Sequence, residues 1–415
     1  MSDFEKFATL FVQEVGSKEG AVSPSIISSA SFAYGTAEIA EGIFDGSVKK
    51  PLYSRMGNPT SARLESIMAK MDGGVGAVAT SSGMGATALA TMSLLTSGDE
   101  IVSVGGLFGG TYSYFNETLG RFGVKTHFFE VDAYEKIEHA INPKTKFIFA
   151  ESVGNPNMRL VNLKKIAAIA NKAGVALIVD NTITPMALEP LALGADIVVY
   201  STTKIISGNA SALGGCAVFR AINDGDDKFK SSRYEFLKNF IKNMGAMALI
   251  ANSKKRVLRD FGMSASAHAS YQTMLGIETL PLRMERIAKS TEIVALALEN
   301  EGFKVNHPVL SSHPDHKLYK EEFKNGCGTL LTLDFGTKQN AFHFLNKTKI
   351  ATLTANIGDS RTLALHMAST IYRDFNKQEC EFLGITDGLV RVSIGLENPQ
   401  DIINDFMACH TNTSL

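Results

Sequence analysis

Several features that would mark a specialised class of protein are scarce in this sequence. Its 415 residues include no tryptophan and four cysteines, namely Cys216, Cys327, Cys380 and Cys409. The cysteines lie far apart and form no CxxC pair, which is typical of unpaired thiols in a reducing compartment and argues against a disulfide framework. The nine histidines form no HxxxH or HExxH pattern, so no metal site is predicted.

An excess of charge of either sign is also missing. The net charge is −1, which gives no reason to expect a nucleic acid or a membrane surface as partner. No run reaches the roughly 20 apolar residues of a membrane span. The first 20 residues lack the basic start and the long apolar run of a signal peptide. We therefore expect a cytoplasmic protein.

The length of the chain predicts two or three domains. Residues 1–55 mix short apolar runs with Gly, Ser and Pro, which is typical of an arm. Residues 56–255 alternate helical segments with short apolar strands, and this pattern favours a mostly parallel sheet covered on both faces. Strands are predicted at 100–105, 125–131, 146–152, 176–182, 196–202 and 214–220. Residues 256–415 then predict a smaller α+β domain, with strands at 328–335, 349–358 and 388–396.

Polar residues follow two of the predicted strands of the larger domain. Asp180 ends the run ALIVD, and Lys204 follows DIVVYSTT. In parallel sheets ligands bind beyond the carboxyl ends of the strands. Ser201 and Thr203, at alternate positions before Lys204, would point their hydroxyl groups the same way. Taken singly, Asp180 is equally explained as a turn residue and Lys204 as a solvated lysine, but together they favour a binding site.

A third segment, Ser82-Gly83-Met84-Gly85, stands directly before a predicted helix. Small residues allow close approach of a phosphate, and the free N–H groups at a helix start favour an anion. Alone, a tight turn explains this segment better.

These elements together match what a pyridoxal 5′-phosphate (PLP) enzyme must supply. Such an enzyme needs a lysine for the Schiff base, an anion beside the pyridine nitrogen, a phosphate cradle and a cation for the substrate carboxylate. Lys204, Asp180 and the 82–85 segment are candidates for the first three. Arg391 and Asn155 are candidates to bind the carboxylate of an amino-acid substrate, since arginine offers a planar bidentate fork.

Several motifs in this order resemble the Cys/Met-metabolism family of PLP enzymes, from about residue 50 to 405. They are Y-S-R at 53–55, S-S-G-M at 81–84, F-G-G-T at 108–111, E-S-x-x-N-P at 151–156, V-D-N-T at 179–182, S-T-T-K at 201–204, G-I-E-T-L-P-L-R at 276–283 and R-V-S-I-G-L-E at 391–397. The resemblance implies an α/β fold of the aspartate aminotransferase type (fold type I), with a seven-stranded, mostly parallel sheet and a smaller C-terminal domain.

The resemblance also implies roles for individual residues. Tyr53 and Arg55 would reach the cofactor phosphate of a neighbouring subunit, so a homo-oligomer, a dimer of dimers, is expected. The phosphate would also contact Ser82, Gly83, Met84, Ser201 and Thr203. Asp180 would hold the ring nitrogen, Phe108 would stack on the ring, Lys204 would form the Schiff base, and Asn155 with Arg391 would bind the substrate.

Within the family, N-I-G-D-S-R-T-L at 356–363 and H-M-A-S-T at 366–370 look most like the O-acetylhomoserine sulfhydrylase branch, which makes homocysteine with a sulfide donor or a protein sulfur carrier. Three departures distinguish this chain: Phe108 replaces the usual tyrosine, Asn209 a histidine and Met367 a proline. Cystathionine γ-synthase or γ-lyase activity and methionine γ-lyase-type elimination stay open as alternatives. A non-catalytic regulatory protein is a more remote alternative. A nicotinamide oxidoreductase is a weaker one, because this sequence lacks the fingerprint glycines of that class.

Overall fold

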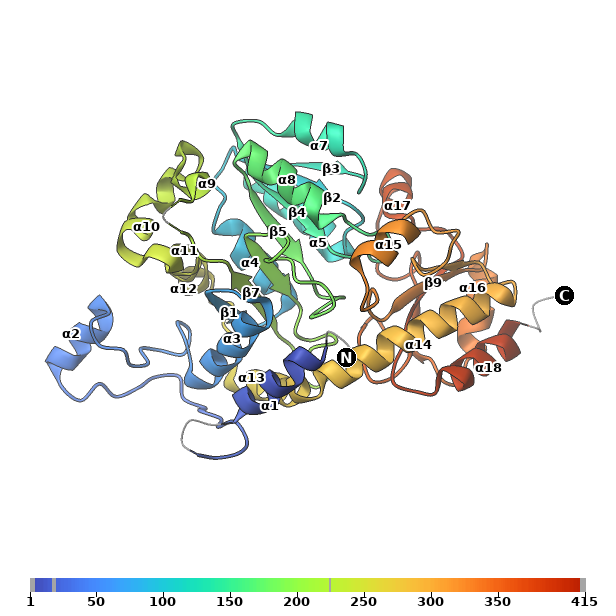
Figure 1. Cartoon of the computed structure of the whole chain (residues 1–415), viewed down its shortest axis with the longest axis horizontal. Coiled ribbons are helices and arrows are strands. Elements are labelled where there is room, and N and C mark those ends of the chain that lie inside the picture. Colours follow the sequence, from blue (N-terminus) through green and yellow to red (C-terminus); the bar gives the residue numbers. More distant parts are fainter. Residues whose placement is uncertain (1–3, 17–19, 224, 411–415) are drawn as a thin grey trace.

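Two β-sheets organise the chain in the computed structural model, which describes residues 4–16, 20–223 and 225–410 (Figure 1). The large sheet has seven strands in the order β1-β7-β6-β5-β4-β2-β3. Their bounds are β1 Gly76–Thr80, β7 Gly215–Phe219, β6 Ile197–Tyr200, β5 Ala176–Asp180, β4 Thr145–Glu151, β2 Glu100–Val104 and β3 Lys125–Phe129. The pairings are parallel apart from the two that β7 makes. The predicted seven-stranded, mostly parallel sheet is confirmed.

Strands in the middle of this sheet are apolar on both faces, which explains their uninterrupted hydrophobic sequences. Phe147 and Phe149 of β4 point into one core, and Ile148 and Ala150 point into the other. Helices α3 (Pro59–Asp72) and α8 (Leu163–Ala173) contribute to the core that contains Ile148. Helix α4 (Gly83–Met92) and the helical segment 227–261 cover the opposite face.

The second sheet has five strands in the order β10-β11-β12-β9-β8 and its own hydrophobic core. The strands are β10 Thr352–Leu353, β11 Leu363–His366, β12 Leu389–Ser393, β9 Leu330–Asp334 and β8 Val305–Asn306. Helices α16 (Lys338–Lys347) and α18 (Pro399–His410) pack against it. An α+β arrangement was predicted for this part of the chain, and its strands β9 and β12 lie where they were expected.

A single long helix, α14 (Leu280–Asn300), passes beneath both sheets (Figure 1). Its first half places Met284 and Ile287 in a core of the large sheet, and its second half places Val294 and Leu298 in the core of the small sheet. One rigid element of 21 residues, about 32 Å long, therefore joins the two hydrophobic cores.

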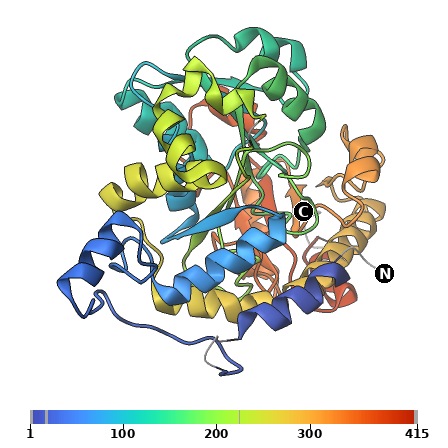
Figure 2. The ribbon, with the colours of Figure 1, turned by 60° about the vertical axis from the view of Figure 1, so that its left-hand side comes forward.

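The first 55 residues contain two different structures. Helix α1 (Glu5–Val15) buries Phe7, Phe11 and Val15 against the body of the protein. The segment from residue 20, including α2 (Ala37–Asp45), stands away from the body (Figures 1 and 2). Phe44 on α2 and Val22 are 71 % and 92 % exposed. The predicted arm therefore begins after a helix that belongs to the core, and the domain boundaries at residues 55 and 255 stay predictions.

The remaining helices are short or connect these parts. They are α5 Gly109–Ser113, α6 Leu119–Arg121, α7 Tyr134–Ala140, α9 Asp227–Lys230, α10 Lys238–Met244, α11 Ala248–Ser253, α12 Arg259–Phe261, α13 Ala267–Glu278, α15 His316–Glu322 and α17 Lys377–Leu383. In the part of the chain that the structure describes, no helix is both long and apolar enough to cross a bilayer.

Candidate active site

The carboxyl ends of β4, β5 and β6 open into a cavity of about 220 Å³. Ten of the twelve predicted site residues line it: Ser82, Gly83, Met84, Phe108, Asn155, Asp180, Ser201, Thr203, Lys204 and Arg391. Both sheets contribute, because Arg391 lies on β12 while Asp180 ends β5. Residues that are up to about 300 positions apart in the sequence therefore meet at one cavity between the two sheets.

Lys204 lies in the turn that follows β6 and is largely withdrawn from solvent. Its Nζ donates a hydrogen bond of 2.7 Å to Oδ1 of Asn356. Burial, together with the weaker effect of the nearby charge of Arg391, lowers the pKa of Lys204 to about 8. A lysine amine in this state is a better nucleophile and a better base at neutral pH than an exposed lysine.

Two carboxyl groups, Glu151 and Asp180, lie side by side at the ends of β4 and β5. Oε1 of Glu151 accepts the N–H of Phe108 at 2.8 Å, and Oδ1 of Asp180 accepts the N–H of Thr182 at 2.9 Å. Burial raises the pKa of both carboxyl groups, and the charge of Asp180 raises that of Glu151 further. Neither forms an ion pair with another described residue, so this part of the cavity suits a cation such as a protonated pyridine ring.

Helix α4 begins at this cavity, with Ser82 as its N-cap: Oγ of Ser82 accepts the N–H of Gly85 at 3.0 Å. A Cβ atom on Gly83 would lie 2.5 Å from Cβ of Ser201. The turn therefore packs directly onto the end of β6, and a glycine is required there by close approach. Because the first N–H groups of a helix lack internal partners, this turn suits a phosphate.

Thr203 differs from Ser201 in how its hydroxyl group is used. Its Oγ1 donates to the carbonyl oxygen of Gly214 at 3.1 Å and accepts the N–H of the same residue at 3.0 Å. The side chain thus ties the lysine turn to the segment before β7. One lone pair of this oxygen is still open to a further donor, whereas its proton is already used.

The cationic side of the cavity is formed by Arg391, which is 3 % exposed. It donates to Oδ1 of Asn155 at 3.2 Å and to the carbonyl oxygens of Ala355 and Asn356 at 3.2 and 3.3 Å. Burial lowers the pKa of Arg391 to about 10. A buried guanidinium held by neutral partners strongly favours an incoming carboxylate.

Asn356 and Glu151 complete the site, and the sequence motifs did not assign a role to either. Asn356 stands in the N-I-G-D stretch that indicated the family branch, and Glu151 opens the E-S-x-x-N-P motif. Tyr372, whose hydroxyl group donates to the carbonyl oxygen of Asn155 at 2.9 Å, was not predicted at all. The polar motifs could have suggested the first two; a buried tyrosine gives no comparable signal.

Tyr53 and Arg55 do not line the cavity of their own chain. The Tyr53 side chain is 43 % exposed, and Arg55 donates to the carbonyl oxygen of Arg259. Both lie at the base of the protruding arm, so their contribution to the site of another subunit stays a prediction.

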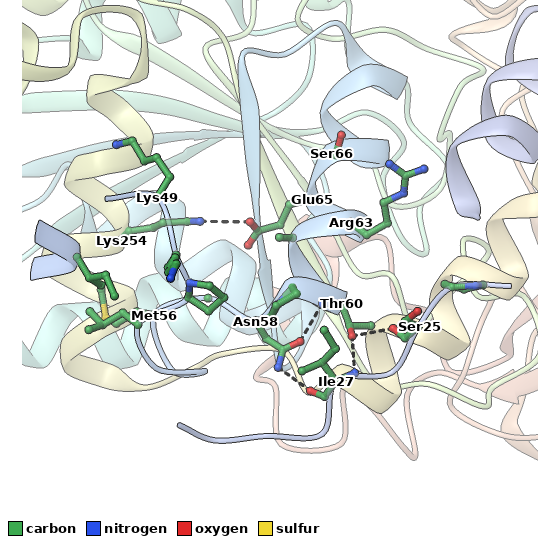
Figure 3. Close-up of a pocket in the computed structure, with 18 of the residues that line it drawn as sticks. Ser25, Ile27, Lys49, Met56, Asn58, Thr60, Arg63, Glu65, Ser66 and Lys254 are labelled. Atoms are coloured by element: carbon green, nitrogen blue, oxygen red, sulfur yellow. Dashed lines mark hydrogen bonds and ion pairs between the residues drawn. The ribbon is translucent and has the colours of Figure 1, made fainter. Parts of the chain in front are cut away.

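A larger hollow of about 970 Å³ lies between this arm and helix α3 (Figure 3). Two side chains anchor the backbone of the arm there: Nδ2 of Asn58 donates to the carbonyl oxygen of Ile27 at 2.8 Å, and Oγ1 of Thr60 donates to that of Ser25 at 2.9 Å. None of the twelve predicted site residues lines this hollow.

The small cavity fits PLP on several independent grounds. It combines a buried lysine with a lowered pKa, carboxyl groups that lack a cation, a helix start closed by Gly83, and an arginine that lacks an anion. Together with the seven-stranded sheet these features define a PLP-dependent enzyme. The chain belongs to the Cys/Met metabolism PLP-dependent enzyme family, whose sequence model matches residues 8–410.

Relatives of known activity resemble the chain over most of its length. It is 36 % identical to the O-acetyl-L-homoserine sulfhydrylase of Leptospira meyeri (85 % of this chain, 84 % of the relative). It is 35 % identical to the homocysteine/cysteine synthase of Saccharomyces cerevisiae (92 % and 91 %) and 32 % identical to the L-methionine gamma-lyase of Pseudomonas putida (93 % and 92 %).

A solved structure extends this likeness to three dimensions. The chain superimposes on a Campylobacter jejuni protein named as a putative O-acetylhomoserine (thiol)-lyase, with a TM-score of 0.93 and 31 % identity, covering 98 % of this chain and 99 % of the other. That protein carries a pyridoxyl-lysine phosphate. The predicted fold class and family are confirmed.

Proposed function

We propose that the protein is an O-acetyl-L-homoserine sulfhydrylase, which replaces the acetoxy group of its substrate with sulfide to give L-homocysteine and acetate. Relatives named for this reaction or for homocysteine synthesis support the proposal. The observation that carries it is the pair of hydrogen bonds from Lys204 and Arg391 to Asn356, which holds a basic amine and a carboxylate-binding group at one cavity.

PLP, when bound, draws electron density away from Cα and Cβ of an amino acid and so makes their protons removable. Nζ of Lys204 is our candidate to remove the Cα proton and to return a proton at the end of the reaction. Its pKa of about 8 makes a neutral amine available near physiological pH. Oδ1 of Asn356 would hold this amine in reach of the substrate while it carries a proton.

Arg391 and Asn155 would bind and orient the substrate carboxylate. The guanidinium already rests on Oδ1 of Asn155, so the two groups are pre-organised for a bidentate ligand. Asp180 would hold the protonated ring nitrogen, and the neutral form of Glu151, favoured by its raised pKa, would keep a second charge from competing. Phe108, Ile183 and Leu213 would limit the access of water, since they supply apolar side chains to the cavity.

Elimination on the same scaffold is the second candidate, because the L-methionine gamma-lyase of Pseudomonas putida is also a relative. Elimination and replacement share every step up to the loss of the γ-substituent. With Phe108 in place of a tyrosine, no phenol hydroxyl group is available at this position, and more of the proton transfer would fall to Lys204.

Feeding O-acetylhomoserine to the PLP-loaded protein, with and without sulfide, separates these candidates. We expect homocysteine to form when sulfide is present and little 2-oxobutanoate to form in either case. Equal amounts of 2-oxobutanoate with and without sulfide would make the protein a lyase. A variant with Lys204→Ala is expected to lose turnover by at least about 10³-fold, as removal of a general base commonly does.

We also propose that the protein acts in the cytoplasm as a homotetramer built from two dimers, with Tyr53 and Arg55 completing the site of a neighbouring subunit. The exposed arm that carries them supports this arrangement. Free sulfide is the simplest sulfur donor; a sulfur carrier protein is the alternative, and it would be indicated if sulfide alone gave no homocysteine.

A further inference from the structure

The turn that carries Lys204 is held by an arginine that does not line the active cavity. Arg283 stands near the start of α14, at the end of the G-I-E-T-L-P-L-R stretch. Its Nη1 donates to the carbonyl oxygen of Ile205 at 2.5 Å, and its Nη2 donates to that of Ile206 at 3.1 Å. One guanidinium group therefore binds the two residues that follow the lysine.

The backbone of the turn offers these two carbonyl groups no donor of its own. The carbonyl oxygen of Lys204 accepts the N–H of Gly208 at 2.9 Å, but no backbone N–H group in the described part of the chain donates to those of Ile205 and Ile206. Both isoleucines are buried. Without the guanidinium group the two carbonyl groups would lose their donor in a place that water reaches poorly, which is costly.

Two glycines allow the turn and the arginine to pack in direct contact. Gly208 has a φ of +76°, and a Cβ atom there would overlap the guanidinium group of Arg283. A Cβ atom on Gly276, at the other end of the G-I-E-T-L-P-L-R stretch, would overlap the backbone of Ile206 and Ser207. This stretch and the lysine turn are consequently fitted to each other, which gives a physical reason for a glycine at both positions.

Arg283 brings to this contact a charge that no carboxylate of the described chain neutralises. Its partners are neutral oxygen atoms, and burial lowers its pKa to about 10, so it stays protonated at neutral pH. To hold α13 against α14, its bonds to the carbonyl oxygen of Gly276 at 2.6 Å and to Oγ1 of Thr279 at 3.2 Å would suffice. The two bonds to the lysine turn come in addition to these.

We propose that Arg283 is a positioning residue for Lys204, which fixes the peptide groups after the lysine so that its amine keeps its place in the cavity. Asn356 holds the amine at 2.7 Å, so the side chain is located at its tip by Asn356 and at its backbone by Arg283. A general base works only within a narrow range of positions. A looser turn should therefore lower kcat at least tenfold and change the KM for the amino-acid substrate, held by Arg391, less than twofold; this kinetic part rests on the proposed function.

Hydrogen exchange and cofactor capture test the role of Arg283 without any turnover. Arg283→Met keeps most of the side-chain length and removes all its donors. In the holoenzyme we expect amide exchange at Ser207 and Gly208 to become at least tenfold faster, while exchange in β4 stays unchanged. In the cofactor-free chain we expect the rate of PLP capture, followed by absorbance, to fall at least tenfold. Arg283→Lys, which keeps the charge but lacks the planar fork, should recover only part of this rate.

Two control variants separate this role from a general effect on stability. Arg286→Met removes an exposed arginine of the same helix, whose guanidinium group donates to the carbonyl oxygen of Glu397 at 3.4 Å. Thr279→Val removes an acceptor of Arg283 at the joint of α13 and α14 and leaves both bonds to the lysine turn. Both controls should match the unaltered protein in exchange and in capture.

Unchanged exchange and capture in Arg283→Met, or an equal loss in Thr279→Val, would overturn the proposal. If Arg283→Met does not fold, the same comparison made with Arg283→Lys decides the question. Neither measurement depends on the reaction that the enzyme catalyses. A protein that behaves as expected in both but makes no homocysteine would contradict the proposed function alone.

Discussion

At the scale of single residues, the charged side chains of the active cavity have no partner of opposite charge within the described part of the chain. Asp180 is partly buried beside Glu151 and forms no ion pair with a described residue. Arg391 rests on neutral oxygen atoms, and the Lys204 amine contacts an amide. Such an arrangement destabilises the cofactor-free fold, and binding of a cationic ring and an anionic substrate relieves it.

Asp180→Asn separates these two effects. In the cofactor-free protein we expect this change to raise the free energy of unfolding by about 1–2 kcal/mol near pH 8, because a desolvated charge is removed while the acceptor for Thr182 is kept. The affinity for PLP should fall at least tenfold. Thermal unfolding and cofactor titration measure the two quantities. Asp374→Asn, at an exposed position, is the control and should change neither.

The lowered pKa of Lys204 predicts how cofactor capture depends on pH. Above a pH of about 8 the amine is neutral and reactive, so the rate of covalent PLP capture should rise with pH and level off there, not near the ordinary lysine value. The folded state binds this proton more weakly than the unfolded state. The stability penalty from Lys204 is therefore fully present below pH 8 and disappears as pH rises toward the ordinary lysine pKa. Stopped-flow absorbance at several pH values tests the rate, and a midpoint above pH 10 would contradict it.

Whether a single site residue can be predicted from the sequence depends on whether a local pattern fixes its position in the fold. Asp180 and Lys204 each end an apolar strand, so their common position at the sheet edge follows from the fold class. The motif around Asn356 could have marked this residue as polar and close to the site, but its contact with Lys204 spans 152 residues and depends on how the small sheet packs, so its partner could not be predicted. Tyr372 was missed for the same reason.

At the scale of elements, the junction of β1, α4 and the end of β6 is closely packed. Gly83→Ala would place a methyl group 2.5 Å from the side chain of Ser201. We expect a loss of about 1–3 kcal/mol in stability and a marked loss of PLP affinity, because the turn must move away from β6. Gly120→Ala, whose added methyl group would meet nothing within 4 Å, should be neutral or slightly stabilising. Equal behaviour of the two variants in unfolding and cofactor titration would contradict this steric cause.

Among the strands, those with a strong local sequence pattern were predicted and the shortest ones were not. The buried strands β4, β5 and β6 were found, because a short apolar run between helical segments is typical of a strand in a covered parallel sheet. A strand over residues 349–358 was predicted, but the paired part, β10, is Thr352–Leu353, and both residues are exposed. β8 has two residues and β11 four, and neither was predicted. Such short strands exist through pairing with distant neighbours, which local preference does not encode.

At the scale of the whole molecule, the exposed arm leads us to expect that each active site is built from residues of two subunits. Lys204→Ala and Arg55→Ala should each be nearly inactive alone. When the two variants are mixed, refolded and purified as hybrids by two different tags, part of the activity should return, because one site then holds an intact Lys204 and an intact Arg55. A hybrid of Lys204→Ala with Asp180→Asn is the control, since each of its sites carries a defect. Absence of recovery in verified hybrids would place the whole site within one chain.

The position of the cavity between two hydrophobic cores has a consequence for how the protein melts. Asn155 follows β4 in the large sheet, whereas Arg391 belongs to β12 in the small sheet. The hydrogen bond between Arg391 and Asn155 therefore connects the two sheets, as helix α14 also does. A carboxylate held by both would tie the two cores together more than it strengthens either one. We therefore expect bound substrate to raise the cooperativity of unfolding, so that the two halves of the chain unfold as a single calorimetric unit.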